Sequence, residues 1–468
     1  MDFLTGMKPA INRALIISIV AIFASFSIIG VVRVYSPIPA FDDWGDYLGF
    51  YADLLDGKYS AWFALYSGHR PILPRALMWL DIRYFGGRFV FLIAANLVIL
   101  CGVIAILMTY LRRLTNKRCM QFVIGGTICI MAVSWLQATN LTGGHSGACW
   151  FMAMLLPLVA CYWLARTKEQ RHFFWLALFA GFASAWTLAN GILVLPLLAT
   201  LALGIGLKPA RIATLAIASV ATIALYFDFA SNEQRSVLGT YWSALTSDPV
   251  GAVRYVLGFL GSPFFYVVSY PLATLQYVFQ GAAAGPAPRP EFGGDLIRDY
   301  PVVFAIGLYT AQAAGMAFIV AAVISARRWF VSGREATSGA LLTFIFFIII
   351  TAVAGAAGRP GIQNSFGPEF VTAALLAWIA LIVLGAPSFN LRRALGIFAC
   401  AAILLFPSQL LPVFGLRRMA DTHERRLQAM QAILHGSDDP ETLSILDADP
   451  DVVRRLRGTK VSIFADGP

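Results

Sequence analysis

Long apolar stretches separated by short polar loops dominate the chain, and many of them approach or exceed the roughly 18–20 residues that cross a bilayer as a helix. The stretches expected to form helices are 11–32, 89–111, 120–138, 148–165, 173–207, 212–227, 301–325, 338–357, 370–385 and 394–414. The stretch 173–207 is too long for one helix. Asn190-Gly191 interrupts it near the middle, which favours two short helices meeting there.

The region 228–300 is ambiguous. Its polar parts, 228–248 and 281–299, flank an apolar piece, 250–280, that contains Pro263 and Pro271. This piece fits two short spans, a re-entrant hairpin or interfacial helices. Basic residues before and after the region require that it begin and end on the outer side, with zero or two crossings. The pattern therefore predicts eleven transmembrane helices, or thirteen.

Basic residues between the apolar stretches set the orientation, because short cytoplasmic loops are rich in Lys and Arg. The residues that mark the cytoplasmic side are Lys8, Arg13, Arg112, Arg113, Lys117, Arg118, Arg166, Lys168, Arg171, Lys208, Arg211, Arg327, Arg328, Arg334, Arg392 and Arg393. They predict a cytoplasmic N-terminus, a large first periplasmic loop at 33–88, and a transmembrane domain at 1–416. The extramembrane tail, 417–468, is expected on the periplasmic side.

Composition agrees with an all-α integral membrane protein that has no soluble core domain. Of 468 residues, 59% are hydrophobic and 13% are charged, and the mean hydropathy is +0.72. Soluble domains carry about 25% charged residues. The net charge of +10 comes from the clusters that set orientation, so it indicates no nucleic-acid partner.

The first outer loop holds the strongest candidates for chemistry. Asp42 and Asp43 are adjacent carboxylates just beyond the first helix, followed by Trp44. A carboxylate there can accept a proton from a hydroxyl group or bind a divalent ion. Trp44 suits the interface, where its ring lies among lipid head groups. The alternative is a solvated loop whose Asp caps the following helix.

Further candidates lie in the same loop and at other helix ends predicted to face outward. His69 and Arg70 form a compact donor pair, with Arg suited to phosphate, although an ordinary exposed pair before a helix would look the same. His145 and Asn190 lie in outer turns. Arg359 stands outside against the usual charge bias, which makes it suggestive. Their shared outer location is better evidence than any one residue.

The sequence pieces "DDW", "GHRPILPRALMWLD" and "YFGGR" resemble the first outer loop of polytopic bacterial GT-C-like glycosyltransferases. Similar pieces recur along most of the chain, namely "TLANGILVLP", "VLGFLGSP", "GRPGIQNSFGPEFVTAALLAW" and "ILDADPDVVRRLRGTKVSIFADG". Two positions depart from the family. Ser67-Gly68 replaces an Asn-Glu pair, and Glu369-Phe370 stands where relatives tend to have Arg-Tyr.

The resemblance implies a GT-C-like helix bundle and a sugar donor linked to polyprenyl phosphate. It makes Asp42 or Asp43 the catalytic base, with Asp42 slightly preferred, and His69, Arg70 and Arg359 ligands of phosphate or acceptor. The resulting hypothesis is a glycosyltransferase of the bacterial inner membrane, of inverting type, whose acceptor is a glycan, lipid or protein. The resemblance fixes no cofactor, and the need for a divalent metal is open. A transporter or flippase, or a polymerase, of lipid-linked glycans is the alternative.

Overall fold

The computed structural model describes residues 9–228, 243–280, 293–414 and 416–466, and within these ranges the regular elements are helical. The long helices are α2 (Pro9–Val34), α5 (Val90–Leu114), α6 (Arg118–Ala132), α8 (Gly144–Ala165), α9 (His172–Ser184), α10 (Val194–Gly204), α11 (Pro209–Asp228), α13 (Pro249–Gln280), α15 (Pro301–Val331), α16 (Ala336–Gly358), α17 (Val371–Gly385), α18 (Leu391–Phe414) and α19 (Leu416–Leu434). The shorter elements are η1 (Asp43–Gly49), α3 (Phe50–Leu55), η2 (Tyr59–Phe63), α4 (Ile72–Phe85), η3 (Trp135–Gln137), α7 (Ala138–Thr142), η4 (Ala189–Leu193), α14 (Gly293–Asp299), η6 (Ile362–Phe366), η7 (Pro368–Phe370), η8 (Ala386–Ser388), α20 (Pro440–Leu446), α21 (Pro450–Leu456) and η9 (Ser462–Asp466).

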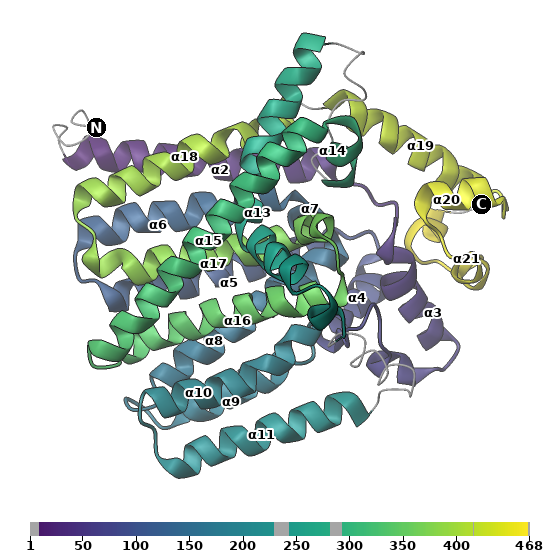
Figure 1. The fold of residues 1–468 in the computed structure, drawn as a ribbon. Helices are drawn as coiled ribbons and strands as arrows, with labels where there is room; N and C mark the ends of the chain where they lie inside the picture. The colour runs from purple at the N-terminus through teal and green to yellow at the C-terminus, as the bar shows by residue number, and fades with distance from the viewer. Residues whose placement is uncertain (1–8, 229–242, 281–292, 415, 467–468) are drawn as a thin grey trace.

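Most long helices run side by side in a single bundle (Figure 1). In the described residues, 10 helices are long and apolar enough to cross a membrane, and α9 and α10 are shorter apolar helices. The expectation of an all-α, multi-pass membrane bundle is confirmed. The predicted pair of short helices in 173–207 is also found, with a break at η4 around Asn190.

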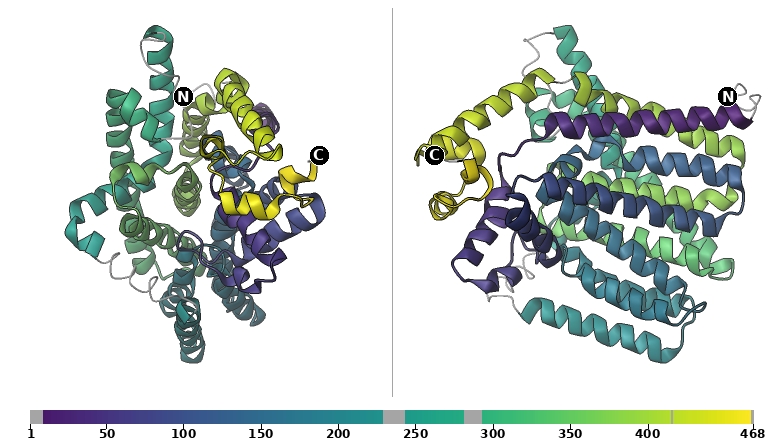
Figure 2. Two further views of the ribbon diagram at one scale, coloured as in Figure 1. Left: turned by 90° about the vertical axis from the view of Figure 1, so that its right-hand side faces the viewer. Right: turned by 180° about the vertical axis from the view of Figure 1, so that it is seen from behind.

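The ambiguous piece 250–280 forms one continuous helix, α13, rather than two spans, a hairpin or several helices. Pro263 and Pro271 lie inside it, which a helix buried among others tolerates because neighbours satisfy the freed backbone groups. Tyr255 and Tyr266, eleven positions apart, both donate hydroxyl hydrogen bonds to the short segment η6. Figures 1 and 2 show that α13 runs across the direction of most other helices of the bundle. The flanking residues 229–242 and 281–292 lie outside the described residues.

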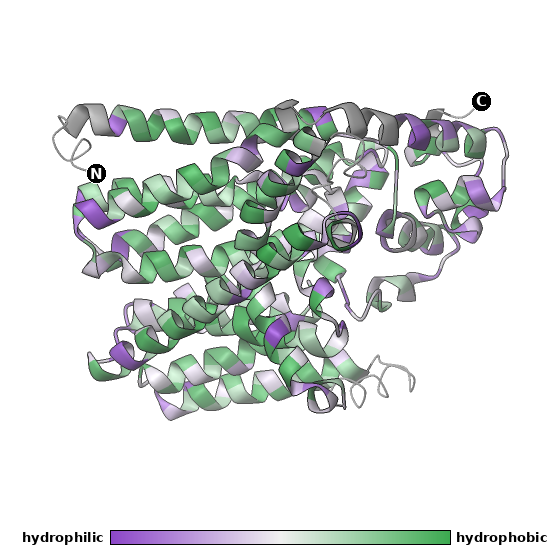
Figure 3. Cartoon of the chain, turned by 45° about the horizontal axis from the view of Figure 1, so that its top comes forward, coloured by the Kyte–Doolittle hydropathy of each residue, from purple (hydrophilic) through white to green (hydrophobic). Residues whose placement is uncertain are grey.

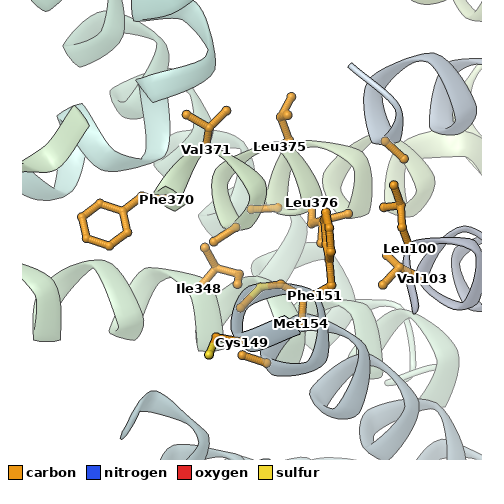
Figure 4. Packing of buried hydrophobic residues seen from close by; sticks show 14 of the residues in the cluster. Leu100, Val103, Cys149, Phe151, Met154, Ile348, Phe370, Val371, Leu375 and Leu376 are labelled. Carbon is orange, nitrogen blue, oxygen red and sulfur yellow. The ribbon is translucent and has the colours of Figure 1, made fainter. Parts of the chain in front are cut away.

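The centre of the bundle is a packed apolar core around α17. Figure 4 shows Leu376 of α17 on the side toward Phe151 of α8 and Ile348 of α16, whereas Val371 and Leu375 point to the other side of α17. All five are buried. Lipid is as apolar as these side chains, so close packing rather than release from water holds such helices together. The core therefore provides a rigid base for the polar groups at one end of the bundle.

The two ends of the bundle differ in chemistry. One, here the basic end, carries the Lys and Arg clusters of the connections α5–α6, α8–α9 and α15–α16; there Arg113 pairs with Glu169 at 2.9 Å. The other, here the loop end, carries residues 35–89, which we call the cap. The helices α19, α20 and α21 lie against the cap (Figure 2), and hydrophilic residues gather there in Figure 3. Connections rich in Lys and Arg therefore alternate along the chain with less basic ones.

Candidate functional site

The acidic segment, Asp42–Asp46, begins the cap and is shaped by its apolar neighbours. It enters a π-helical turn, η1, a rare element that occurs frequently at functional sites. Trp44, Tyr47 and Leu48 are buried, and the Trp44 indole donates a hydrogen bond to the Pro39 carbonyl at 3.2 Å. The expectation that Trp44 lies among lipid head groups is therefore wrong, because its ring anchors the turn inside the cap.

A tight turn places Tyr66 and His69 beside the acidic segment. Tyr66 and His69 exchange both backbone hydrogen bonds, at 2.8 and 2.9 Å, around Ser67 and Gly68. Both central residues have positive φ, 49° and 82°, which is the signature of a type I′ turn. The Ser67-Gly68 departure from the family pattern is thus a turn that presents the flanking side chains.

Tyr66 reaches Asp42 because Gly45 leaves room for its ring. A Cβ atom at Gly45 would lie 2.7 Å from the Tyr66 ring, closer than such contacts allow. The Tyr66 hydroxyl donates to Asp42 Oδ1 at 2.9 Å, while the rest of the Asp42 side chain is exposed. Burial, together with the charge of Asp42, raises the pKa of Tyr66 above its ordinary value, so the phenol stays a donor at neutral pH.

Asp43 is the partly buried member of the acidic pair. Its Oδ2 accepts a hydrogen bond from the Ala40 N–H at 3.1 Å, and the side chain remains partly accessible. Burial raises the pKa of Asp43 to about 6, and the neighbouring charge of His145 opposes that rise. A carboxyl group with a pKa near 6 is ionised at neutral pH yet more basic than an ordinary aspartate, as a general base requires.

Asp46 is a site residue that the sequence reasoning missed, and it lies at the centre of a buried charged cluster. Its side chain is 1% exposed; Oδ1 accepts from Arg75 Nη2 at 2.5 Å and Oδ2 lies 3.0 Å from His145 Nε2. Burial alone would raise the pKa of Asp46, but His145 and Arg75 lower it below its ordinary value. The signal available in the sequence was a third Asp in Asp42-Asp43-Trp44-Gly45-Asp46, three positions after Asp43.

Arg75 and Arg70 are both fully buried and serve the backbone of the cap. Arg75 also donates to the carbonyls of Ala61 and Ala64, at 2.9 and 2.6 Å. Arg70 is 2% exposed; it donates to the carbonyl of Tyr226, at 3.0 Å, and to that of Phe63. In this arrangement Arg70 is buried and ties the cap to the end of α11.

His69 lies at the break between α9 and α10. Its Nδ1 accepts a hydrogen bond from the Ala189 N–H at 3.1 Å, so the neutral ring carries its proton on Nε2. Burial lowers the pKa of His69 to about 4, with the charge of Arg359 acting in the same direction. His69 is therefore a neutral N–H donor. The adjacent Asn190 donates to the Thr351 hydroxyl at 3.1 Å, which fixes the break against α16.

Arg359 follows α16 and is the most open arginine among the candidates. Its side chain is 50% exposed, and its Nη1 lies 3.1 Å from Glu369 Oε1. The guanidinium also lies over the Phe370 ring, at 5.7 Å from the centroid. Glu369-Phe370, the second departure from the family pattern, is thus the direct partner of Arg359.

A small cavity of about 20 Å³, enough for about one water molecule, lies beside Pro368. It is lined by Val34, Trp135, Leu136, Ala138, Thr139, Thr142, Tyr270, Pro368, Ser408 and Leu411, a mixture of apolar side chains and hydroxyl groups. In the part of the chain that the structure describes, no three His, Cys, Asp or Glu side chains are grouped so that they could hold a metal ion.

These features define a class: a helical, multi-pass membrane bundle with a polar cap and an acid–base cluster at one end. No family model and no curated protein matches the chain. Among solved structures it is similar to the Archaeoglobus fulgidus oligosaccharyltransferase in the apo form, with 13% identity and a TM-score of 0.46. It is also similar to the archaeal oligosaccharyltransferase AglB from Archaeoglobus fulgidus in complex with an inhibitory peptide and a dolichol-phosphate, with 14% identity and a TM-score of 0.45.

Both alignments cover 92% of this chain and 59% of the other chain, so this chain spans well under two thirds of the length of those proteins. Such low TM-scores and identities assign neither a fold family nor an activity to the chain.

Proposed function

We propose that the chain is a glycosyltransferase that moves a sugar from a polyprenyl-phosphate donor to an acceptor hydroxyl group at the loop end. One observation carries this proposal: the partly accessible carboxylate of Asp43 lies near the charge of His145, and His145 and Arg359 both act on His69, at one end of an apolar bundle. A base, a neutral donor and an open cation at the same end are the groups that transfer from a lipid-linked phosphate needs.

Asp43 is the better candidate for the base, whereas the family resemblance slightly favoured Asp42. With a pKa of about 6, Asp43 is still ionised at pH 7 and is a stronger proton acceptor than an ordinary aspartate. In the reaction the acceptor oxygen forms a bond to the anomeric carbon while its proton passes to Asp43. The bond from that carbon to the phosphate oxygen breaks, and the lipid phosphate leaves with the electron pair. Direct displacement inverts the anomeric centre.

Arg359 and His69 are the proposed ligands of the donor phosphate. Arg359 can turn its forked donors from Glu369 to a phosphate, because its side chain is half exposed. His69 can add a hydrogen bond from Nε2, since its other nitrogen is already engaged with Ala189.

The proposed location is the bacterial inner membrane. The basic end would face the cytoplasm, because Lys and Arg collect in cytoplasmic loops. The N-terminus would then be cytoplasmic, and the cap and the tail periplasmic. Substrate would enter the loop end sideways from the outer leaflet. The acceptor would be a glycan, a lipid or a protein.

The test is sugar transfer from a polyprenyl-phosphate sugar in detergent, measured for Asp43→Asn, Asp42→Asn, the double variant and the parent. Loss of a general base costs about 10²–10⁴-fold in rate, so Asp43→Asn should fall by that factor and Asp42→Asn much less. Glu441→Gln, an exposed carboxylate of α20, is the matched control and should keep the parent rate. If the single and double variants all keep near-parent turnover, the cap is not the active site. The hypothesis of a transporter or flippase then replaces that of a glycosyltransferase.

A further inference from the structure

The C-terminal segment is joined to the cap by backbone hydrogen bonds at both ends of the cap. The Phe41 N–H donates to the Leu446 carbonyl at 3.1 Å, directly before the acidic segment. The Ser462 N–H donates to the Gly86 carbonyl at 2.9 Å, where the cap returns to the bundle. The two contacts bracket the cap, so the tail fixes where it begins and where it ends.

A shared ion pair joins the tail to the middle of the cap. Arg455 of α21 places Nη2 2.7 Å from Asp53 Oδ1 and 2.7 Å from Asp56 Oδ2, and its side chain is 22% exposed. Val452, on the same helix, lies against the backbone of η1, where a Cβ atom at Gly49 would meet it at 3.4 Å. Partial burial and two carboxylates make this contact stronger than an ordinary surface pair.

Phe41 adopts a conformation that needs such support. Its φ is 56°, in the left-handed region that an aromatic residue rarely occupies. Such a conformation is strained and persists only where the surroundings fix it. The tail supplies two of the contacts: the Leu446 carbonyl accepts from the Phe41 N–H, and the Arg426 guanidinium of α19 lies over the Phe41 ring, 5.3 Å from its centroid. Within the cap, the Trp44 N–H donates to the Phe41 carbonyl at 3.1 Å.

Through its contact with Phe41, Arg426 lies beside the acidic segment that carries the proposed base. Its positive charge acts on Asp43 and lowers the pKa of that carboxyl group, against the effect of burial. The other titratable groups that act on or with Asp43 are His145 of α8, Asp42 of the acidic segment, and Tyr47 and Tyr66 of the cap. Arg426 is therefore the cation that the tail contributes to this cluster.

We propose that the segment α19–η9 is a working part of the site: it locks Phe41 and the acidic segment in place, and it supplies Arg426 as a positioning residue for Asp43. The locking role stands on contacts alone. The role of Arg426 rests on the proposed function, because the protonation of the base is measured through the pH dependence of sugar transfer.

The locking role is tested by hydrogen–deuterium exchange of the full chain in detergent. Arg455→Met should speed exchange of the amides of residues 41–56 by roughly three- to tenfold, because opening of the cap becomes easier. Arg454→Met is the matched control, since Arg454 is 64% exposed and pairs only within α21, with Asp451. Exchange that is equal in both variants and in the parent would overturn the locking role, whether or not the protein transfers sugar.

The role of Arg426 is tested by the pH–rate profile of transfer. Without that charge the pKa of Asp43 rises, so the acid limb of the profile of Arg426→Ala should move to higher pH. The rate should then be roughly twofold or more lower at pH 6 and near the parent rate at pH 8. Arg426→Lys should restore the limb, and Arg425→Ala, an exposed neighbour, should leave it unmoved.

An acid limb that stays in place in Arg426→Ala would remove Arg426 from the site. A parent enzyme without transfer activity would instead contradict the proposed function, and the exchange experiment would still decide whether the tail locks the cap.

Discussion

The charged groups in the interior of the cap differ from those on its rim in how deeply they are buried and how fully they are paired. In the interior, Asp46, Arg75 and Arg70 are each at most 3% exposed, and they bond to carboxylate, imidazole or backbone carbonyl groups. On the rim, Asp42 of the cap is exposed, and Arg359, which follows α16, is 50% exposed and pairs with Glu369.

The difference follows from the cost of burying charge. A buried ion must be paired and hydrogen-bonded, so its donors and acceptors are already committed within the protein. A charge on the rim stays partly hydrated and can exchange water for a ligand. The interior therefore sets the shape of the cap, and the residues proposed for chemistry lie on the rim. Substitutions in the interior should lower stability, whereas substitutions on the rim should lower activity.

The largest effect is expected from Arg75→Met. It removes one partner of a buried ion pair, and Asp46 Oδ1 and the carbonyl groups of Ala61 and Ala64 lose their arginine donor. Breaking a buried pair in this way costs about 3–5 kcal/mol. Thermal unfolding in detergent, followed by tryptophan fluorescence, should show a strongly lowered midpoint. Arg83→Met, an exposed arginine on the same helix, is the control and should unfold like the parent. Equal midpoints would show that the interior is not what holds the cap.

A smaller effect, of a different kind, is expected from Arg359→Ala. Loss of a charged hydrogen bond to phosphate should weaken donor binding by about 1–3 kcal/mol, or roughly 5- to 150-fold. The measurement is the affinity of the detergent-solubilised protein for a polyprenyl phosphate. Arg70→Met should lower the unfolding midpoint instead, and the fraction that remains folded should bind the lipid normally. Donor affinity that is unchanged in Arg359→Ala would remove Arg359 from the phosphate site.

Sequence reasoning was strong for the helices and weak for this division between interior and rim. Length and apolarity alone located the long helices, because few other structures can hold such stretches. They failed at α13, since Pro263 and Pro271 break exposed helices but are tolerated in packed ones. Arg70 and Arg359 look alike in sequence. Only the packing of Arg70 against the Tyr226 carbonyl, 156 positions away, distinguishes them, and a local pattern contains no such information.

The smallest expected effect belongs to Tyr66→Phe, and it separates the two rim carboxylates. The phenol donates one hydrogen bond, to Asp42, which contributes about 0.5–1.5 kcal/mol. If Asp43 is the base, the variant should slow transfer only modestly, and the acid limb of its pH–rate profile should stay where it is in the parent. It should also add nothing in an Asp42→Asn background, because the same hydrogen bond is already disturbed. Tyr59→Phe, with a side chain 73% exposed, is the control. An acid limb that moves to higher pH in Tyr66→Phe would mean that the phenol stabilises the ionised base itself, and the role of base would then return to Asp42.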